Sequence, residues 1–190
     1  MNAGFHPDAQ LAQGAENCRY IFAYGSLIWN PGFSFREKQM AHLRGYHRSL
    51  CVYSRHYRGT EEVPGLVLGL DRGGACKGIV YHVEDAVWAD VLAYVRAREL
   101  ISGVYVEVQR HVQLQGEDKK VWALTYVVNH QHPQYAGKLE LDEIAKFVAQ
   151  GQGLSGSSLH YVEKTLEALK AIGITEKKLE AVVKRLTYQA

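Results

Sequence analysis

Two stretches of the chain, far apart in the sequence, contain residues that could carry out chemistry on a small polar molecule. The first is Arg19 to Pro31, in which Tyr24, Gly25 and Ser26 follow a run of strand-favouring residues. Gly25 permits positive φ, so consecutive backbone N–H groups can converge on one point, where an anion or a polarised carbonyl can bind. Ser26 adds a hydroxyl. The alternative is an ordinary turn between a strand and a loop.

The second stretch is Glu84 to Glu99, where apolar residues recur at helical spacing: Val87, Trp88, Val91, Leu92 and Val95. One further step of four residues from Val95 predicts that Glu99 lies on the buried face at the end of the helix. Burial and the negative end of the helix dipole would both raise the pKa of Glu99, as a general base near neutral pH requires. Alternatively, Glu99 pairs with Arg96 or Arg98, or the helix ends earlier and the carboxylate is solvated.

Other common chemistries find little support. Ser26 is not part of a Gly-x-Ser-x-Gly arrangement, so it is not expected to be a nucleophile. His130 and His132 have no third ligand nearby in the sequence, and no metal site is predicted. The Gly151-x-Gly153 pair lacks the preceding strand and the lysine of a phosphate loop.

The elements that must position these residues follow from periodicity and turn signals. A run of strands precedes the helix that ends at Glu99, two more strands follow it, and the chain ends in helices. A polar loop covers 54–60, and Gly73-Gly74 is interpreted as the turn of a hairpin. A glycine-serine run at 151–158 could be a flap. The expected strands are 20–24, 44–53, 65–70, 76–83, a half-exposed 104–114 and a buried 121–128; the expected later helices are 141–149, 159–172 and one opened by Thr175.

Composition limits the class of protein. With 190 residues, 47% of them hydrophobic and 22% charged, the chain suits one globular domain, expected at 19–188 after a loose N-terminal tail at 1–18. The net charge of +2 comes from scattered residues, which argues against a nucleic-acid partner. Three widely spaced cysteines, without a signal peptide or a long apolar run, predict free thiols in a cytoplasmic protein that does not enter membranes.

Several short motifs, taken together and in order, resemble the ChaC-type γ-glutamylcyclotransferases. The resemblance covers residues 20 to 185 and its specificity comes from the joint occurrence of the motifs. Two departures concern Ala23, where many relatives have glycine, and the segment after Glu99, where animal members have Lys-Gly-Gly-Tyr. The motifs are Tyr24-Gly-Ser-Leu-Ile-Trp-Asn-Pro31, Arg58-Gly-Thr60, Arg98-Glu99, Gly103-x-Tyr105 and Ser155-Gly156 with Tyr161.

The resemblance implies an α+β fold, with a small closed or strongly curved, mainly antiparallel β-barrel, flanking helices and a helical C-terminus. It also implies cleavage of glutathione to 5-oxoproline and cysteinylglycine without a metal or an organic cofactor. Glu99 would be the general base and then the acid. Two alternatives remain: a cyclotransferase for other γ-glutamyl amino acids or amines, and a non-catalytic module that binds a γ-glutamyl metabolite. The substrate-binding residues would be Tyr24, Gly25, Ser26 and Leu27, with Arg58 and Tyr135 near the distal glycine carboxylate or, equally, on surface loops.

Overall fold

The computed structural model describes residues 18–187. Of the expected N-terminal tail, residues 1–17 lie outside this range, and Cys18 is buried, with its thiol donating to the carbonyl of Trp122. The described residues divide into two compact units. The first contains residues up to 24, 32–48 and 70–129, and the second contains 25–31, 49–69 and the residues from 130 onward. That residues 19–188 form one domain stays a prediction.

Five strands form a closed barrel in the order β1-β3-β2-β4-β5. The pairs β1–β3, β2–β4 and β4–β5 are antiparallel, and β1 pairs with β5 in parallel, with Ile21 opposite Leu124. The expected closed, mainly antiparallel barrel with flanking helices is therefore confirmed. The strands are β1 (Tyr20–Ala23), β2 (Glu37–Ser54), β3 (Gly65–His82), β4 (Tyr105–Leu114) and β5 (Lys120–Val128).

Two predictions about where strands begin and end were wrong. β3 is one continuous strand from Gly65 to His82, and the expected hairpin at Gly73-Gly74 does not form. Both glycines have positive φ, 93° and 69°, which bends the strand locally without reversing it. β2 begins at Glu37, seven residues before the expected start, because polar residues continue the strand beyond the apolar run used to find it.

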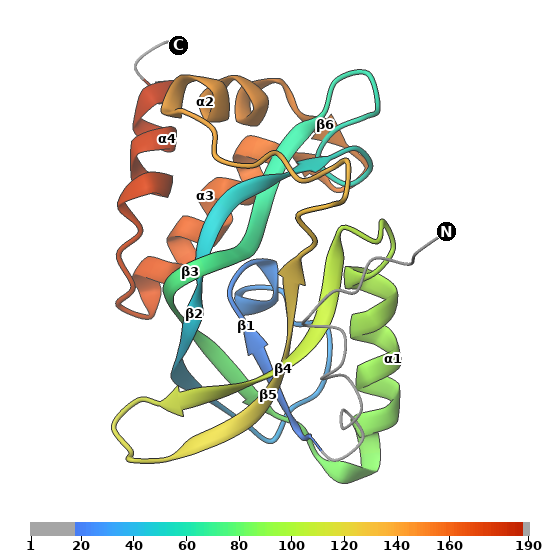
Figure 1. Ribbon diagram of the computed structural model, residues 1–190, viewed down its shortest axis with the longest axis vertical. Helices are drawn as coiled ribbons and strands as arrows, with labels where there is room; N and C mark the ends of the chain where they lie inside the picture. The colour runs from blue at the N-terminus through green and yellow to red at the C-terminus, as the bar shows by residue number, and fades with distance from the viewer. Residues whose placement is uncertain (1–17, 188–190) are drawn as a thin grey trace. The chain divides into compact units, whose positions relative to one another are not determined.

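Helix α1 (Trp88–Glu99) belongs to the first unit, where the 3-10 helix η4 (Asp85–Val87) precedes it. The expected apolar stripe is confirmed, except that Val87 is only half-buried. In Figure 1, α1 lies alongside β4. The prediction that β4 is half-exposed was wrong near its start, because Glu107 and Gln109 are buried on the face expected to meet water. The buried residues of the stripe are Trp88, Val91, Leu92 and Val95.

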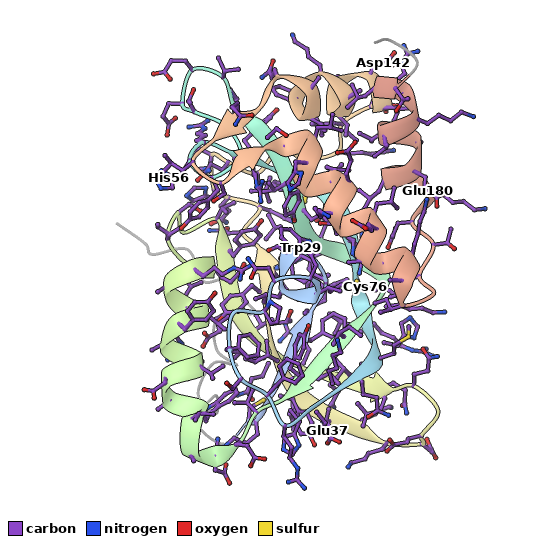
Figure 2. All side chains as sticks on the ribbon, turned by 180° about the vertical axis from the view of Figure 1, so that it is seen from behind. Trp29, Glu37, His56, Cys76, Asp142 and Glu180 are labelled. Atoms are coloured by element: carbon purple, nitrogen blue, oxygen red, sulfur yellow. The ribbon has the colours of Figure 1, made fainter. Side chains whose placement is uncertain are left out.

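Three helices pack on one another in the second unit, as Figure 1 shows: α2 (Leu141–Gln150), α3 (Ser158–Ala171) and α4 (Lys177–Thr187). The Ser157 hydroxyl caps α3 by accepting the His160 N–H at 3.0 Å, and Gly173 follows the helix with a φ of 73°. Asp142, labelled in Figure 2, accepts from Arg185 and so joins α2 to α4. Among residues 18–187, no helix is long and apolar enough to cross a membrane.

The glycine-serine run forms a short two-stranded sheet, β6 (Gln152–Gly153) and β7 (Gly156–Ser157). The backbone N–H groups of Leu154 and Ser155, at its turn, donate to the carbonyls of His56 and Tyr57. The run is thus hydrogen-bonded to the polar loop at 54–60, which carries Arg58. Whether it acts as a flap stays a prediction.

Candidate functional site

Glu99 is the last residue of α1, as predicted, and its side chain is only 16% exposed. Burial raises the pKa of this carboxyl above its ordinary value of 4.5, and the positive charge of Arg98 opposes the rise. The Arg98 Nε lies 3.5 Å from the nearer Glu99 oxygen, which is long for a strong ion pair. Both interpretations of the sequence therefore hold in part: the carboxylate is largely buried and it also pairs with Arg98.

Arg96 does not form an ion pair with Glu99, although the two residues are three positions apart on α1. Its guanidinium donates two hydrogen bonds, of 2.8 and 2.6 Å, to the two carboxylate oxygens of Glu107 on β4. The Tyr126 hydroxyl, from β5, donates a third at 3.1 Å. Burial and the negative charges of Glu107 and Glu99 raise the pKa of Tyr126, so its hydroxyl keeps the proton that it donates.

Glu107 was not among the site residues predicted from the sequence, because strand alternation assigned it to the solvent-facing side of β4. The structure shows it 9% exposed. A usable signal was present: a glutamate on a strand directly after an Arg-rich helix end is a candidate partner for one of those arginines. Four charged side chains and a tyrosine thus gather at the end of α1, and Glu99 is the member whose raised pKa suits proton transfer. These residues are Glu99, Arg96, Arg98, Glu107 and Tyr126.

Tyr24 is buried at the end of β1, and its carbonyl is held by another residue that the sequence did not reveal, Arg48. The Arg48 Nε donates to the Tyr24 oxygen at 2.5 Å, and a second guanidinium nitrogen donates to the Lys77 oxygen at 2.7 Å. Arg48 itself is 6% exposed. Because a trans peptide is planar, fixing the Tyr24 carbonyl also fixes the direction of the Gly25 N–H, which points the opposite way.

The loop after β1 continues as the 3-10 helix η3 (Ser26–Ile28) in the second unit. The Ile28 N–H donates to the Gly25 carbonyl, and the N–H groups of Trp29 and Asn30 donate to the Ser26 carbonyl. Leu27 is buried. Trp29, labelled in Figure 2, donates its indole N–H to the Thr165 hydroxyl on α3 at 3.1 Å, which holds the loop against that helix.

The prediction that Gly25 provides a positive φ was wrong. Its φ is −128°, so positive φ is not what requires a glycine here. A Cβ at Gly25 would lie 3.2 Å from the hydroxyl oxygen of Tyr161, closer than nine in ten Cβ contacts. The glycine therefore permits the close approach of Tyr161, a buried residue of α3 whose hydroxyl oxygen also accepts the Leu68 N–H at 3.4 Å.

Arg58 also packs against Tyr161. Its guanidinium lies 5.6 Å from the centre of the Tyr161 ring and donates to the Ser157 carbonyl at 3.3 Å, while its backbone N–H donates to the Ser54 hydroxyl. Arg58 is 9% exposed, so the surface-loop alternative was wrong for this residue. Burial lowers the pKa of Arg58, although an arginine remains protonated at neutral pH. Gly25 and Arg58 are thus brought together through Tyr161.

Four glycines enclose the backbone of Arg58. A Cβ at any of them would lie 2.1 to 2.6 Å from backbone atoms of Arg58 or of its neighbours in the second unit. At Gly151, for example, the added carbon would lie 2.3 Å from the Gly65 Cα and 2.5 Å from the Arg58 carbonyl oxygen. Three chain segments can meet around Arg58 only because side chains are absent at Gly59, Gly65, Gly151 and Gly153.

Tyr135 lies in a different environment. It pairs with Val52 of β2 in an isolated bridge, its N–H donates to the His132 carbonyl, and its ring stacks on His130 with 4.4 Å between ring centres. No group of three or more histidine, cysteine, aspartate or glutamate side chains suited to a metal ion occurs among residues 18–187.

Known proteins are similar to this chain in sequence and in fold. Residues 19–189 match the family described as ChaC-like protein. The chain is 30% identical over 157 residues to the glutathione-specific gamma-glutamylcyclotransferase of Escherichia coli (strain K12), covering 83% of this chain and 68% of that one. It is 31% identical over 185 residues to glutathione-specific gamma-glutamylcyclotransferase 1 of Rattus norvegicus, covering 93% and 83%.

A solved structure supports the fold independently. The crystal structure of a gamma-glutamyl cyclotransferase specific to glutathione from yeast superposes with a TM-score of 0.81 over 89% of this chain and 95% of that one. Its sequence identity is 20%, so this likeness concerns the fold. Since the family match spans nearly the whole chain and the relatives are about 30% identical over most of their length, the chain belongs to the ChaC-like protein family.

Proposed function

We propose that this protein is a γ-glutamylcyclotransferase that cleaves glutathione to 5-oxoproline and cysteinylglycine. The observation that carries the proposal is Glu99, a largely buried carboxylate at a helix end with a raised pKa, in a chain of this family. Relatives about 30% identical to it carry the name of that activity. Enzymes raise the pKa of a carboxyl group in this way to obtain a proton acceptor that works near neutral pH.

The proposed reaction is an intramolecular substitution. The α-amine of the γ-glutamyl group attacks its own γ-carbonyl carbon, a C–N bond closes the five-membered lactam, and the bond to the cysteinyl nitrogen breaks. Glu99 accepts the proton released by the attacking amine and donates it to the leaving nitrogen. Well-oriented intramolecular attack can contribute roughly 7–11 kcal/mol, so no protein nucleophile is needed.

The remaining residues would hold the folded substrate. Backbone N–H groups of the loop from Tyr24 to Leu27 would bind the glutamyl carboxylate or the developing oxyanion. Arg58 would attract a substrate carboxylate, a role supported by its burial and its ordered guanidinium. Tyr135 would contact the distal glycine carboxylate, although its contacts with His130 and Val52 lend this role less support.

The direct test is incubation of the purified protein with glutathione, followed by chromatography for 5-oxoproline and cysteinylglycine. Formation of both products in equal amounts is the expected result. Release of 5-oxoproline from other γ-glutamyl amino acids or amines, but not from glutathione, would favour the second substrate class. Tight binding of glutathione without turnover would instead indicate the non-catalytic binding module.

The pH dependence of the reaction should report Glu99. A general base must be deprotonated, so kcat/KM should rise with pH through the pKa of Glu99, which burial places above 4.5. The apparent pKa of the acidic limb should therefore be higher than the pKa of an ordinary glutamate. Initial rates are measured across buffers of constant ionic strength. An apparent pKa at or below that of an ordinary glutamate would contradict the assignment of the base to a buried carboxyl.

Arg58→Met should raise the KM for glutathione by about tenfold or more, because a hydrogen bond to a charged group contributes roughly 1.5–3 kcal/mol. The kcat should fall less, since the reacting atoms are not expected to touch this side chain. Arg185→Met is the control, because it removes the same charge from the exposed ion pair with Asp142. Equal KM values for the two variants would rule out the carboxylate role.

We also propose a cytoplasmic location. The three cysteines, Cys18, Cys51 and Cys76, are buried and free of disulfides, which suits a reducing compartment. Fractionation of cells that express the chain with an antibody tag would test this, and recovery outside the cytoplasmic fraction would overturn it.

A further inference from the structure

The end of α1 holds more charge than one general base requires. Arg96 and Glu99 are three residues apart on the helix, a spacing at which arginine and glutamate commonly form an ion pair. Instead, both donors of the Arg96 fork meet the two oxygens of Glu107 on β4, at 2.8 and 2.6 Å. Glu99 is left with the long contact from Arg98 at 3.5 Å.

The hydrogen bonds of Glu107 fix its carboxylate in a position that binds Arg96. Its carboxylate accepts the planar fork of Arg96 in a bidentate arrangement and a third hydrogen bond from Tyr126, and it is 9% exposed. A carboxylate fixed by three donors cannot easily change partners. Arg96, by contrast, is 42% exposed in its side chain and has a long stem that can turn. Glu107 therefore holds Arg96 on the β4 side with two short hydrogen bonds.

We propose that Glu107 is a positioning residue for Glu99: by binding the Arg96 guanidinium, it keeps this charge from pairing with the Glu99 carboxylate. The inference rests on the proposed function for its catalytic meaning, but its electrostatic content can be tested without turnover. Arg98 from α1 and Tyr126 from β5 interact electrostatically with Glu99, and Glu107 from β4 joins Tyr126 to Arg96 from α1 through hydrogen bonds.

A double-mutant cycle distinguishes this arrangement from a simple sum of fixed charges. The carboxyl pKa of Glu99 is measured by NMR titration of ¹³C-labelled glutamate, assigned with Glu99→Gln, in the wild type, Glu107→Gln, Arg96→Gln and the double variant. We expect Glu107→Gln to lower the pKa, because the released Arg96 moves to Glu99. Arg96→Gln should have little effect alone and a large effect in the Glu107→Gln background.

The result that overturns the proposal is additivity, in which the effects of the two single changes sum to that of the double variant. Glu107→Asp provides a second test, including the case in which Glu107→Gln does not fold. It keeps the negative charge but shortens the side chain, so a lower pKa of Glu99 would follow from release of Arg96 and not from a lost charge. If Glu107→Asp folds and the pKa of Glu99 is the same as in the wild type, the proposal is contradicted.

Activity gives an independent readout. If the wild type releases 5-oxoproline, Glu107→Gln should move the acidic limb of its kcat/KM profile to lower pH, and adding Arg96→Gln should move it back. If the wild type makes no product, the proposed function fails while the NMR cycle still decides the role of Glu107. An active wild type with an additive cycle would refute this inference alone.

Discussion

Glu99→Gln is expected to lower kcat for 5-oxoproline release by about 10²-fold or more, the usual contribution of a positioned general acid–base group. Glutamine keeps the size of the side chain but cannot accept the proton of the attacking amine. Binding of glutathione should be retained, because the proposed substrate-binding residues are unchanged. Initial rates by product chromatography, together with calorimetric titration of glutathione, would separate the two effects.

The same substitution should not destabilise the protein near neutral pH. The folded state raises the pKa of Glu99, so it binds the proton more tightly than the unfolded chain does. Stability must then fall as pH rises from about the unfolded value of 4.5 through the folded pKa. Glutamine removes this loss, so the variant should unfold at an equal or higher temperature than the wild type above that range.

Glu163→Gln is a suitable control, because Glu163 is exposed on α3 and the change removes the same charge. Its rate should match that of the wild type. A Glu99→Gln protein that is folded and fully active would refute the assignment of the base, whereas an inactive protein with a lower melting temperature would point to structural damage.

Gly151→Ala is expected to destabilise the protein by about 3 kcal/mol or more, at the upper end of the range for overpacking. Gly151 has φ of −71° and ψ of 117°, which alanine adopts without strain, so the whole effect is steric. The added methyl carbon would lie 2.3 Å from the Gly65 Cα and 2.5 Å from the Arg58 carbonyl oxygen. For a chain of this size, the melting temperature should fall by roughly 6–12 °C.

Gln152→Ala tests whether proximity to the same backbone is enough to cause the effect. Gln152 is exposed on β6, beside Gly151 in the sequence, and its replacement should change the melting temperature little. Gly151→Ala should also raise the KM for glutathione, because the backbone of Arg58 must move to make room. A melting temperature equal to that of the wild type would mean that the packing of the glycines around Arg58 is less tight than the structure shows.

The sequence was sufficient where a feature depends on local periodicity. The apolar stripe of α1 located the helix, its last buried turn and the carboxylate at its end, because a helical repeat fixes which side chains share a face. The same periodicity located α3, which was expected at 159–172 and extends from Ser158 to Ala171. The free thiols followed from the number and spacing of the cysteines.

Predictions from the sequence were wrong where the role of a residue depends on segments far away in the sequence. Gly25 was explained by its own backbone conformation, but its function is to admit the Tyr161 hydroxyl from α3. Gly73-Gly74 was interpreted as a turn because glycine pairs often form turns, yet β3 continues through both residues. Glu107 was assigned to solvent because alternation records which face of the strand a side chain occupies, and not what covers that face.

The sequence by itself determined the family motifs, the order of helices α1 to α4 and the identity of the candidate base, since these depend on residue types and short spacings. Only the tertiary structure decided which arginine serves which carboxylate: Arg96 binds Glu107, and Glu99 is left with Arg98. It also revealed the four glycines packed around Arg58. The physical reason is that pairing and close packing depend on distances between segments far apart in the chain, which no local pattern encodes.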